Sequence, residues 1–572
     1  MKFNNLAEAL QDCANTAKAT EGFRFLDEAG KEDGFLSFAE LRDKAAQMAV
    51  ALKKIGLKKG DAVGLIIPEQ KDFVVSFYAC VWAGLVAVPL AAPYQISKLD
   101  HYIKNLQEIS KTAEIKTFVV TSRLKPYLGG VLSSQVKKIS LVSELQNEST
   151  AEPLEPTTAE DLAFLQFTSG STAEPKGVKV SNRNIMANCK CIAEDGIKLN
   201  SADSFFSWLP FYHDMGLIGF LLTTVIYRCS GTFLSPLAFI KRPNLWLKGI
   251  SKYSATISFA PNFAYSLCVK RIKEEELKDL DLSKWRLAGC GAEPIQSSTV
   301  ESFIEKFSKC GFASKSFKAC YGMAESTLAV AFPKMDDDVL FDTVQDGTSS
   351  IKYISCGGAF PDHEISVRAE DLTCCKEHVV GEIAIKGPSV TQGYINNDNA
   401  TAATIKDGWL YTGDYGYLAE GNLYICGRRK DLIIISGKNY YPSDVEALLV
   451  SVPGLRQGNA VAFSISAEQV DKLIICAEKS KDSKHSDKDI TDVIRGEVLS
   501  NLGITVADVV LLPAGALPKT TSGKLQRAKV KELYLHSGLG AAGQNQLGPI
   551  CLAWKLGVTW IRSKASYYLA NH

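Results

Sequence analysis

Along the first 380 residues, segments with apolar side chains at helical spacing alternate with short apolar runs that are typical of strands. Residues 35–60 carry apolar side chains at helical spacing, and Gly56 ends that pattern, which predicts an amphipathic helix. Two short apolar runs, DAVGLIIP and VAVPL, flank the helical segment DFVVSFYACVWAG, and similar runs recur at IKTFVVTS, ATISFAP and WRLAGCGAEP. Strands that alternate with helices in this way predict an α/β fold with largely parallel sheets.

The pattern changes after about residue 380. GEIAIKG, NLYICG and DLIIISG are short alternating strands separated by glycine turns, and they predict a β-rich lobe. Beyond GRRKD the helical segments PSDVEALLVSV and KDITDVIRGEVLSNLG enclose the strands GNAVAFSIS and KLIICAEK, which indicates a small α+β domain. We therefore predict a large N-terminal domain over residues 1–428, a small C-terminal domain over 429–537, and a linker with an amphipathic tail over 538–572.

Composition narrows the class of protein. A chain of 572 residues exceeds the size of one compact core, so two or more domains are expected. The 64 basic and 63 acidic side chains lack the basic excess that nucleic-acid binding requires. The N-terminus lacks an apolar signal region, and no run of about 18 uncharged apolar residues appears, so neither export nor a membrane span is predicted. The 15 irregularly spaced cysteines are expected to be reduced thiols in a cytoplasmic protein.

The tail combines aromatic residues and cations on one predicted helix. In residues 550–568 the apolar and aromatic side chains recur at helical spacing, with lysine and arginine between them. Such a helix favours either peripheral membrane contact or docking on the protein or on a partner, and the sequence leaves both interpretations open.

The strongest local signal is TSGSTAEPKG, residues 168–177, which follows the apolar strand LAFLQF. Glycines and small hydroxyl residues after a strand let backbone N–H groups and hydroxyls converge on phosphate oxygens, and Lys176 adds a cation. The GK[ST] ending of a Walker A loop is missing. A flexible linker is the alternative, but a linker does not require Pro-Lys-Gly. The candidate phosphate-binding residues are Thr168, Ser169, Gly170, Ser171, Thr172 and Lys176.

Five further motifs follow in order: GCGAEPI, YGMAEST, YTGDYG, GRRKDLI and PKTTSGKLQR. Over roughly residues 35–535 the six motifs together resemble the adenylate-forming superfamily of acyl-CoA synthetases, luciferases and peptide-synthetase adenylation domains. The resemblance implies the adenylate-forming ligase fold with a mobile small domain. It also implies an enzyme that uses ATP and Mg²⁺ to activate a carboxylic acid as its acyl-AMP, with release of pyrophosphate.

The resemblance also implies which residues bind the nucleotide. The adenine side is assigned to Gly291, Ala292, Glu293, Tyr321, Gly322 and Met323. Tyr321 offers a flat apolar face to the base. Asp414 is suited to accept both ribose hydroxyl protons, and the permanently charged Arg428 suits ribose or phosphate oxygens. Taken singly, Asp414 could instead cap a turn and Arg428 could form a structural ion pair.

The remaining assignments concern metal, hinge and catalysis. By resemblance Glu325 binds Mg²⁺ with a contribution from Thr172, Lys430 is the hinge, and Lys524 bridges the carboxylate and the phosphate. A carboxylate is already ionised at pH 7, so the protein must mainly position it and neutralise charge on the transferring phosphoryl group. A solvated loop lysine is the alternative for Lys524.

WLPFYHDMGLIG, residues 208–219, narrows the branch of the superfamily. Its pair His213–Asp214 is similar to that of fatty acyl-AMP ligases, and APNFAY, SCGG and GKNYYPSDVE agree with this. We count His213 with Lys524 as a candidate catalytic residue. The resemblance implies a medium- or long-chain fatty acid as substrate and an acyl carrier protein as acceptor, and the segment 331–353 lies where these ligases carry an extra restraining segment.

Two alternatives stay open. The first is a fatty acyl-CoA synthetase that transfers the acyl group to free coenzyme A. The second is an inactive nucleotide- or acyl-binding module, which the retention of Lys176, Glu325, Asp414, Arg428 and Lys524 disfavours. Five aromatic residues lie near motifs that border the acyl site and suit either its lining or the core, namely Phe205, Trp208, Phe211, Phe259 and Phe263.

Overall fold

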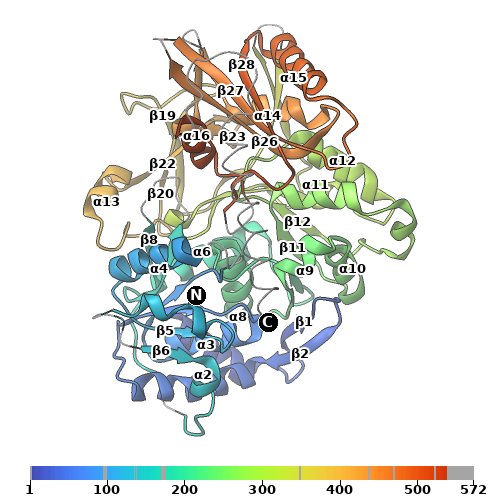
Figure 1. Cartoon of the computed structure of the whole chain (residues 1–572). Helices are drawn as coiled ribbons and strands as arrows, with labels where there is room; N and C mark the ends of the chain where they lie inside the picture. Colours follow the sequence, from blue (N-terminus) through green and yellow to red (C-terminus); the bar gives the residue numbers. More distant parts are fainter. Residues whose placement is uncertain are drawn as a thin grey trace, which may run out of the picture. The chain divides into compact units, whose positions relative to one another are not determined.

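The computed structural model describes residues 3–93, 99–133, 136, 138–151, 153–168, 175–346, 349–435, 438–467, 470–520 and 524–536 (Figure 1). The chain divides into two compact units. Unit 1 consists of Met1–Asp342 and Lys352–Ile425, and unit 2 consists of Thr343–Ile351 and Cys426–His572. The amphipathic tail lies outside the described residues, so both interpretations of it remain predictions, as do the predicted domain limits.

A six-stranded sheet in unit 1 carries the predicted alternation of strands and helices. Its strands, in spatial order, are β6 (Lys138–Leu141), β5 (Ile115–Val120), β3 (Ala62–Ile66), β4 (Val86–Pro89), β7 (Leu162–Thr168) and β8 (Lys176–Ser181). Neighbouring strands are parallel, except that β7 and β8 are antiparallel. The parallel character confirms the prediction from sequence.

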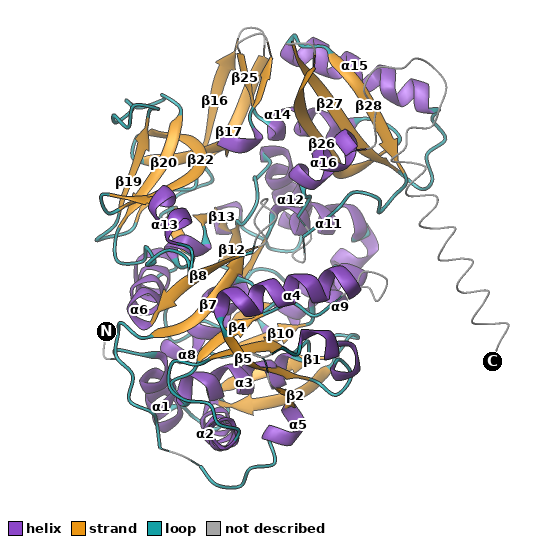
Figure 2. Cartoon of the chain, turned by 60° about the vertical axis from the view of Figure 1, so that its left-hand side comes forward, coloured by secondary structure: helices purple, strands orange, loops and turns teal. Residues whose placement is uncertain are grey.

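One helix packs directly on this sheet, and Figure 2 shows it next to β5. Helix α3 (Gln70–Trp82) is buried along almost its whole length because it packs on β3 and β4 as well as on α1 (Leu6–Thr16) and α2 (Phe38–Lys54). A helix covered on both sides has no polar face to keep, which explains the near-continuous apolar run FVVSFYACVW.

Helix α2 confirms the predicted amphipathic helix but begins three residues later. Residues 35–37 end the strand β2 (Glu32–Ser37), and Ser37 caps the helix in a reciprocal capping box with Glu40. This exchange satisfies backbone donors at the first turn, so it fixes the start at Phe38. Gly56 takes a left-handed φ of 96° just beyond the C-terminal end, as the sequence predicts.

A seven-stranded sheet forms the second layer of strands in unit 1. Its strands, in spatial order, are β13 (Phe317–Ala319), β12 (Leu287–Cys290), β11 (Ile257–Ala260), β9 (Phe205–Ser207), β10 (Gly231–Leu234), β1 (Gly22–Leu26) and β2. All pairs are parallel apart from β1 and β2. The carboxyl ends of β12 and β13 lead directly into two of the predicted adenine-side motifs.

Antiparallel strands confirm the β-rich lobe. A five-stranded sheet contains β19 (Glu364–Arg368), β20 (Gly381–Lys386), β22 (Trp409–Ala419), β21 (Ile405–Lys406) and β23 (Asn422–Arg428). A three-stranded sheet contains β14 (Tyr321–Gly322), β15 (Ala329–Phe332) and β18 (Gly358–Ala359). The segment 331–353 includes β16 (Phe341–Asp346) and part of β17 (Ser349–Ile354), which pair as a two-stranded sheet.

The other helices of unit 1 connect and cover these sheets. They are α4 (Leu99–Ala113), α5 (Val142–Leu145), α6 (Asn182–Lys190), α7 (Asp214–Gly216), α8 (Thr223–Ile226), α9 (Pro236–Lys241), α10 (Asn244–Tyr253), α11 (Asn262–Arg271), α12 (Ser297–Ser308) and α13 (Asp398–Thr404).

Unit 2 has its own apolar core. Its main sheet has the order β26 (Leu455–Ala467), β27 (Val470–Lys479) and β28 (Val506–Leu512), and β24 (Ile433–Ile435) pairs with β25 (Lys438–Tyr440). Three helices complete it, α14 (Pro442–Leu448), α15 (Asp487–Leu502) and α16 (Arg527–His536), which Figure 1 shows in orange to red. The strand β28 is an addition to the predicted elements, and it pairs with β27 in parallel.

Two further features concern the whole described chain. The cysteines in the described ranges are all free, and most of them are buried. None of the helices in those ranges is both long and apolar enough to cross a bilayer.

Candidate active site

The predicted phosphate loop connects two neighbouring strands of the six-stranded sheet. Thr168 ends β7 and faces Lys176, the first residue of β8, across the antiparallel pair. Ser169, Gly170, Ser171 and Thr172 lie outside the described residues. A Cβ at Gly177 would lie 2.7 Å from the Phe167 ring and 2.9 Å from the Ile395 side chain, so a larger residue there would force these side chains to shift.

Lys176 and Glu325 both contact one tyrosine. The Nζ atom of Lys176 lies 5.2 Å from the ring centre of Tyr394, and the Tyr394 hydroxyl donates a hydrogen bond of 2.7 Å to Glu325 Oε1. Tyr394 is buried. Burial first, and the Glu325 carboxylate next, raise the pKa of the Tyr394 hydroxyl, so it stays protonated and acts as a donor. The structure therefore links the predicted phosphate-binding cation to the predicted metal ligand.

The turn that carries Glu325 is held at several points. This turn lies between β14 and β15. The backbone carbonyl of Glu325 accepts a hydrogen bond of 2.9 Å from the Thr391 N–H group. Thr327, which is fully buried, has φ 65° and ψ −67°, and its hydroxyl donates to the Ser389 carbonyl at 2.7 Å. A non-glycine residue in this region is strained and persists only where its surroundings hold it. Asn188 adds two hydrogen bonds to the backbone of Ala329.

Asp414 and Tyr321, predicted to bind ribose and adenine, are in direct contact. The Tyr321 hydroxyl donates to Asp414 Oδ2 at 2.7 Å, although the two residues are 93 positions apart. Asp414 is buried on β22, and its own N–H group donates to the Thr412 hydroxyl at 3.1 Å. Met323 lies beside the Tyr321 hydroxyl, with its sulfur 3.9 Å from that oxygen. This contact fixes the orientation of both the ring and the carboxylate.

The adenine-side loop follows β12. Ala292 takes a left-handed φ of 70°, and the Glu293 carboxylate accepts a hydrogen bond of 2.6 Å from the Phe263 N–H group in the first turn of α11. The Glu293 carboxylate therefore accepts from a backbone N–H group that has no partner within its own helix. Gly291 and Ala292 belong to the loop that follows β12. Gly322 is required by a close approach, since a Cβ there would lie 2.1 Å from the Leu328 carbonyl oxygen.

His213 directly precedes the short helix α7 and is oriented by its neighbour. Its Nδ1 atom lies 2.6 Å from Asp214 Oδ1, which also accepts the Met215 N–H group at 2.7 Å. An acceptor at Nδ1 favours a proton on that nitrogen. Close by in sequence, Trp208 is buried and stacks on Phe239 at 3.9 Å, so this aromatic side chain contributes to the core.

Three predicted site residues belong to unit 2. Arg428 ends β23, and Lys430 lies in the short 3-10 turn Arg429–Asp431. Lys524 follows residues that lie outside the described part, and its backbone is fixed by Thr520, whose N–H group donates to the Lys524 carbonyl at 2.7 Å. The roles of these residues remain predictions.

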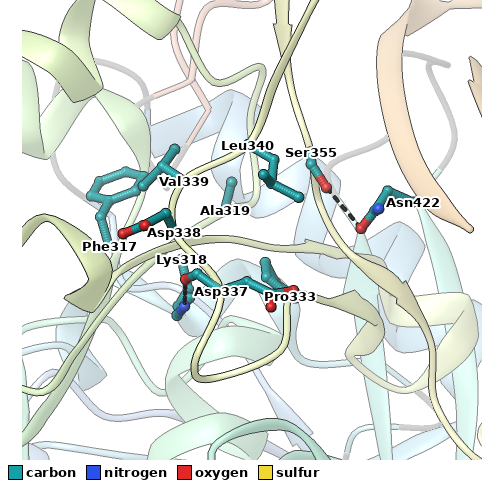
Figure 3. Close-up of a pocket in the computed structure, with 10 residues that line it drawn as sticks. All are labelled: Phe317, Lys318, Ala319, Pro333, Asp337, Asp338, Val339, Leu340, Ser355 and Asn422. Atoms are coloured by element: carbon teal, nitrogen blue, oxygen red, sulfur yellow. Dashed lines mark hydrogen bonds between the residues drawn. The ribbon is translucent and has the colours of Figure 1, made fainter. Parts of the chain in front are cut away.

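A small pocket in unit 1 lies at the end of β13 and is lined by none of the predicted site residues (Figure 3). One of its lining residues is Lys318, which is fully buried. Lys318 donates hydrogen bonds to the backbone carbonyls of Lys334 at 3.0 Å and Asp337 at 2.5 Å. Burial lowers the pKa of Lys318. Across the pocket the Ser355 hydroxyl donates to Asn422 Oδ1. The two hydrogen bonds of Lys318 hold the loop that follows β15.

Sequence reasoning missed Tyr394, Thr391 and Asn188. Each lies far from Glu325 along the chain, and Tyr394 is 69 residues away from it. The only local signal is Gly-Tyr after the strand GEIAIKG, which by itself indicates a turn.

Comparison with known proteins places these observations in a family. The model of the family described as AMP-binding enzyme matches residues 13–395, and the model described as Disco-interacting protein 2-like, AMP domain, matches residues 430–544. A Caulobacter vibrioides protein with the provisional name acyl-CoA synthetase is 36% identical over 94% of this chain and 96% of its own length. The medium-chain-fatty-acid–[acyl-carrier-protein] ligase JamA of Moorena producens is 33% identical over 94% of this chain and 96% of its own.

Solved structures agree with the sequence relatives. A structure from a study of fatty acyl-adenylate ligases of E. coli and L. pneumophila has a TM-score of 0.88 and 37% identity, and the match covers 93% of this chain and 98% of the other. This likeness confirms the predicted adenylate-forming ligase fold. Since the first family model alone spans more than half of its residues, the chain belongs to the AMP-binding enzyme family.

Proposed function

We propose that this enzyme activates a medium- or long-chain fatty acid with ATP and Mg²⁺ as its acyl-AMP, and then passes the acyl group to the phosphopantetheine arm of an acyl carrier protein. The observation that carries the proposal is the arrangement in unit 1, where Tyr321 holds Asp414 and Tyr394 contacts both Glu325 and Lys176. Carboxylates for ribose and metal and a cation for phosphate are the groups that ATP requires.

The chemistry needs positioning more than proton transfer. An oxygen of the ionised fatty acid attacks the α-phosphorus of ATP, one O–P bond forms, and the bond to the bridging oxygen breaks as pyrophosphate leaves. No proton must be removed from the nucleophile at pH 7. In the proposal Asp414 orients the ribose, Lys176 contacts phosphate oxygens, and Lys524 neutralises charge that develops between the carboxylate and the α-phosphate.

The residues present fit a magnesium ion that arrives with the nucleotide. Among the described residues no group of three or more His, Cys, Asp or Glu side chains could hold a metal alone. Mg²⁺ commonly takes one or two carboxylates and completes its octahedron with substrate phosphates and water, so Glu325 suffices as the described ligand, and Thr172 is the second proposed ligand. The ion would neutralise charge on the pyrophosphate leaving group.

The acceptor is the finer part of the proposal. Free coenzyme A and a carrier protein present the same thiol, but coenzyme A gains affinity through its nucleotide end, while a carrier gains it through a protein surface. The sequence features PFYHDMGL, APNFAY and SCGG support the carrier, and JamA is named as a ligase that uses one. The provisional name of the Caulobacter relative supports the alternative, transfer to coenzyme A.

Adenylation is tested with the pure protein, labelled fatty acids from C8 to C18, ATP and Mg²⁺, by measuring acyl-AMP and pyrophosphate. Lys524→Ala should reduce acyl-AMP formation on the order of a hundredfold or more and leave ATP affinity nearly unchanged, because this charge acts mainly in the transition state. Absence of both products with every acid would reject the enzymatic proposal in favour of a nucleotide-binding module. Near-normal adenylation by the variant would remove the role of Lys524.

Acceptor choice is tested by measuring thioester formation side by side, with millimolar coenzyme A and with micromolar phosphopantetheinylated carrier protein. We expect the carrier to react much faster. Efficient acyl-CoA formation would overturn this part and leave adenylation intact. A proline at the proposed hinge, Lys430→Pro, should slow one half-reaction more than the other because proline fixes φ, whereas an equal loss in both would place the hinge elsewhere.

A further inference from the structure

Tyr394 reaches the site through a backbone segment that docks on β8. The Ile395 N–H group donates to the Gly177 carbonyl at 2.8 Å, and the Lys179 N–H group donates to the Gly393 carbonyl at 2.9 Å. Tyr394 itself faces Val178 across an antiparallel bridge. The segment 393–395 therefore runs beside the strand that begins with Lys176. Main-chain hydrogen bonds on both sides of Tyr394 fix the position of its backbone.

The stretch that leads into this segment, residues 391–394, holds Glu325 at two points. The Thr391 N–H group donates to the Glu325 carbonyl at 2.9 Å, and the Tyr394 hydroxyl donates to the Glu325 carboxylate at 2.7 Å. A hydrogen bond from a buried donor to an ionised carboxylate is stronger than one between neutral groups. Both the backbone and the side chain of Glu325 are therefore held by one short stretch of chain, residues 391–394.

The ring of the same tyrosine contacts the cation. Lys176 Nζ lies within the range at which an ammonium group is attracted by the face of an aromatic ring. Among the contacts of the described residues, neither Lys176 nor Glu325 forms an ion pair. A direct pair would cancel the two charges that a magnesium–nucleotide complex needs, whereas a neutral tyrosine between them keeps both charges.

We propose that Tyr394 is a positioning residue that orients the Glu325 carboxylate with its hydroxyl and the Lys176 ammonium with its ring, so that both are set before the metal and the nucleotide bind. This inference rests on the proposed function of Glu325 and Lys176. The hydroxyl and the ring of Tyr394 then have separate roles. The hydroxyl supports metal binding through Glu325, and the ring supports phosphate binding through Lys176.

The test compares Tyr394→Phe with Tyr394→Leu. Mn²⁺ is the metal probe, followed by electron paramagnetic resonance, and α,β-methylene-ATP is the nucleotide, so that binding is measured without turnover. Tyr394→Phe should weaken Mn²⁺ binding in the presence of the nucleotide by about tenfold, since loss of a partner that orients a metal ligand costs about 10- to 100-fold in affinity. It should leave affinity for the metal-free nucleotide unchanged. Tyr394→Leu should weaken both.

The matched control is Tyr253→Phe. Tyr253 lies on α10, and its hydroxyl has no hydrogen-bond partner among the described residues, so its removal should change neither affinity. Thermal unfolding of all variants separates a local effect from a loss of fold. Equal Mn²⁺ affinity in Tyr394→Phe and wild type, with both folded, would overturn the proposal.

A double-mutant cycle with Glu325→Gln gives a second readout. If Tyr394 acts through Glu325, the two substitutions together should weaken Mn²⁺ binding no more than Glu325→Gln alone. Additive losses would overturn the proposal even where Tyr394→Phe is less stable. The proposed function fails separately: a wild-type protein that binds the Mn²⁺–nucleotide complex without forming acyl-AMP rejects fatty acid activation and leaves the positioning role in place.

Discussion

Buried and half-buried carboxylates are held in two different ways in the two units. In unit 1 the hydroxyls of Tyr394 and Tyr321 donate to Glu325 and Asp414, at 2.7 Å in each case. In unit 2 the Arg527 guanidinium pairs with both carboxylate oxygens of Glu446, at 2.7 and 2.9 Å, and with Asp431 at 3.0 Å. A phenol fixes the direction of a carboxylate and leaves its charge, whereas a guanidinium fixes and neutralises it.

The two kinds of hydrogen-bond donor match two roles: carboxylates held by a tyrosine are those proposed to bind ligands, and carboxylates held by an arginine stabilise the fold. A carboxylate that must accept ribose hydroxyls or a metal has to keep its negative charge, and a neutral donor permits this. The unit 2 cluster joins Asp431 before β24 and Glu446 on α14 to the start of α16, so its charges are used within the fold. Asp203 and Arg286 repeat this structural pattern inside unit 1, with the Asp203 side chain almost fully buried.

The largest expected effect is on unit 2. Arg527→Met leaves Glu446 and Asp431 without their shared cation. Breaking a fully buried ion pair costs about 3–5 kcal/mol of unfolding free energy, and because these three side chains are 17–22% exposed we expect a loss of about 3 kcal/mol. Urea or thermal unfolding measures this loss. Lys529→Met, which removes an exposed pair with Glu532, is the control and should change stability by less than about 1 kcal/mol. A stable Arg527→Met protein would show that the cluster is not the structural element that the comparison requires.

The next effect concerns the charge on Asp414. Asp414→Asn keeps the shape and an acceptor oxygen for Tyr321 but removes the charge, so ATP affinity should fall about 10- to 100-fold, as loss of charge-assisted hydrogen bonds implies. Stability should barely change, in contrast to Arg527→Met. Calorimetric titration with ATP provides the measurement, and Asp371→Asn, at an exposed position, is the control. Unchanged ATP binding would assign Asp414 to the scaffold.

Arg286→Met tests the ion pair between Asp203 and Arg286 in unit 1, whose contribution to stability should depend on pH. Burial would raise the pKa of Asp203, but hydrogen bonds from Arg286 and the Asn200 N–H group outweigh it and lower the pKa. The ionised pair therefore stabilises the fold above the usual Asp pKa of about 3.9, and this stability is lost as the pH falls through the lower folded-state pKa. We expect Arg286→Met to cost about 2 kcal/mol at pH 7 because the arginine is partly exposed.

Unfolding across pH checks the sign of that prediction. The difference between wild type and Arg286→Met should be largest near neutral pH and should shrink below about pH 4. Arg183→Met breaks the exposed pair with Glu160 and serves as the control, with an effect under about 1 kcal/mol. A difference that grows on acidification would contradict the assigned pairing.

The smallest expected effect is that of Tyr321→Phe. It removes the hydroxyl that donates to Asp414 but keeps the ring, so ATP affinity should fall only about 3- to 10-fold, in line with the loss of one hydrogen bond. Combined with Asp414→Asn, it should add less than its separate effect, because both substitutions disturb one contact. Full additivity would mean that the tyrosine orients the base without acting through Asp414.

Element types were predictable where the pattern is local. The buried runs that became β3, β4 and α3 are recognisable from consecutive residues, because a strand or helix of this kind depends on apolar period and length. The strand β28 has no place in the predicted order, since its partner β27 lies beyond a whole helix, α15. The start of α2 depended on one side-chain exchange at Ser37 that periodicity does not show.

For the candidate site, the sequence by itself determined which side chains to look for, since Lys176, Glu325, Asp414 and Lys524 stand in ordered motifs. The tertiary structure alone decided what holds them. Tyr321 on β14 meets Asp414 on β22 across 93 residues, and Tyr394 meets Glu325 across 69. A motif encodes chemistry in neighbouring residues, but a hydrogen bond between distant residues depends on how the whole core packs, and no local pattern carries that information.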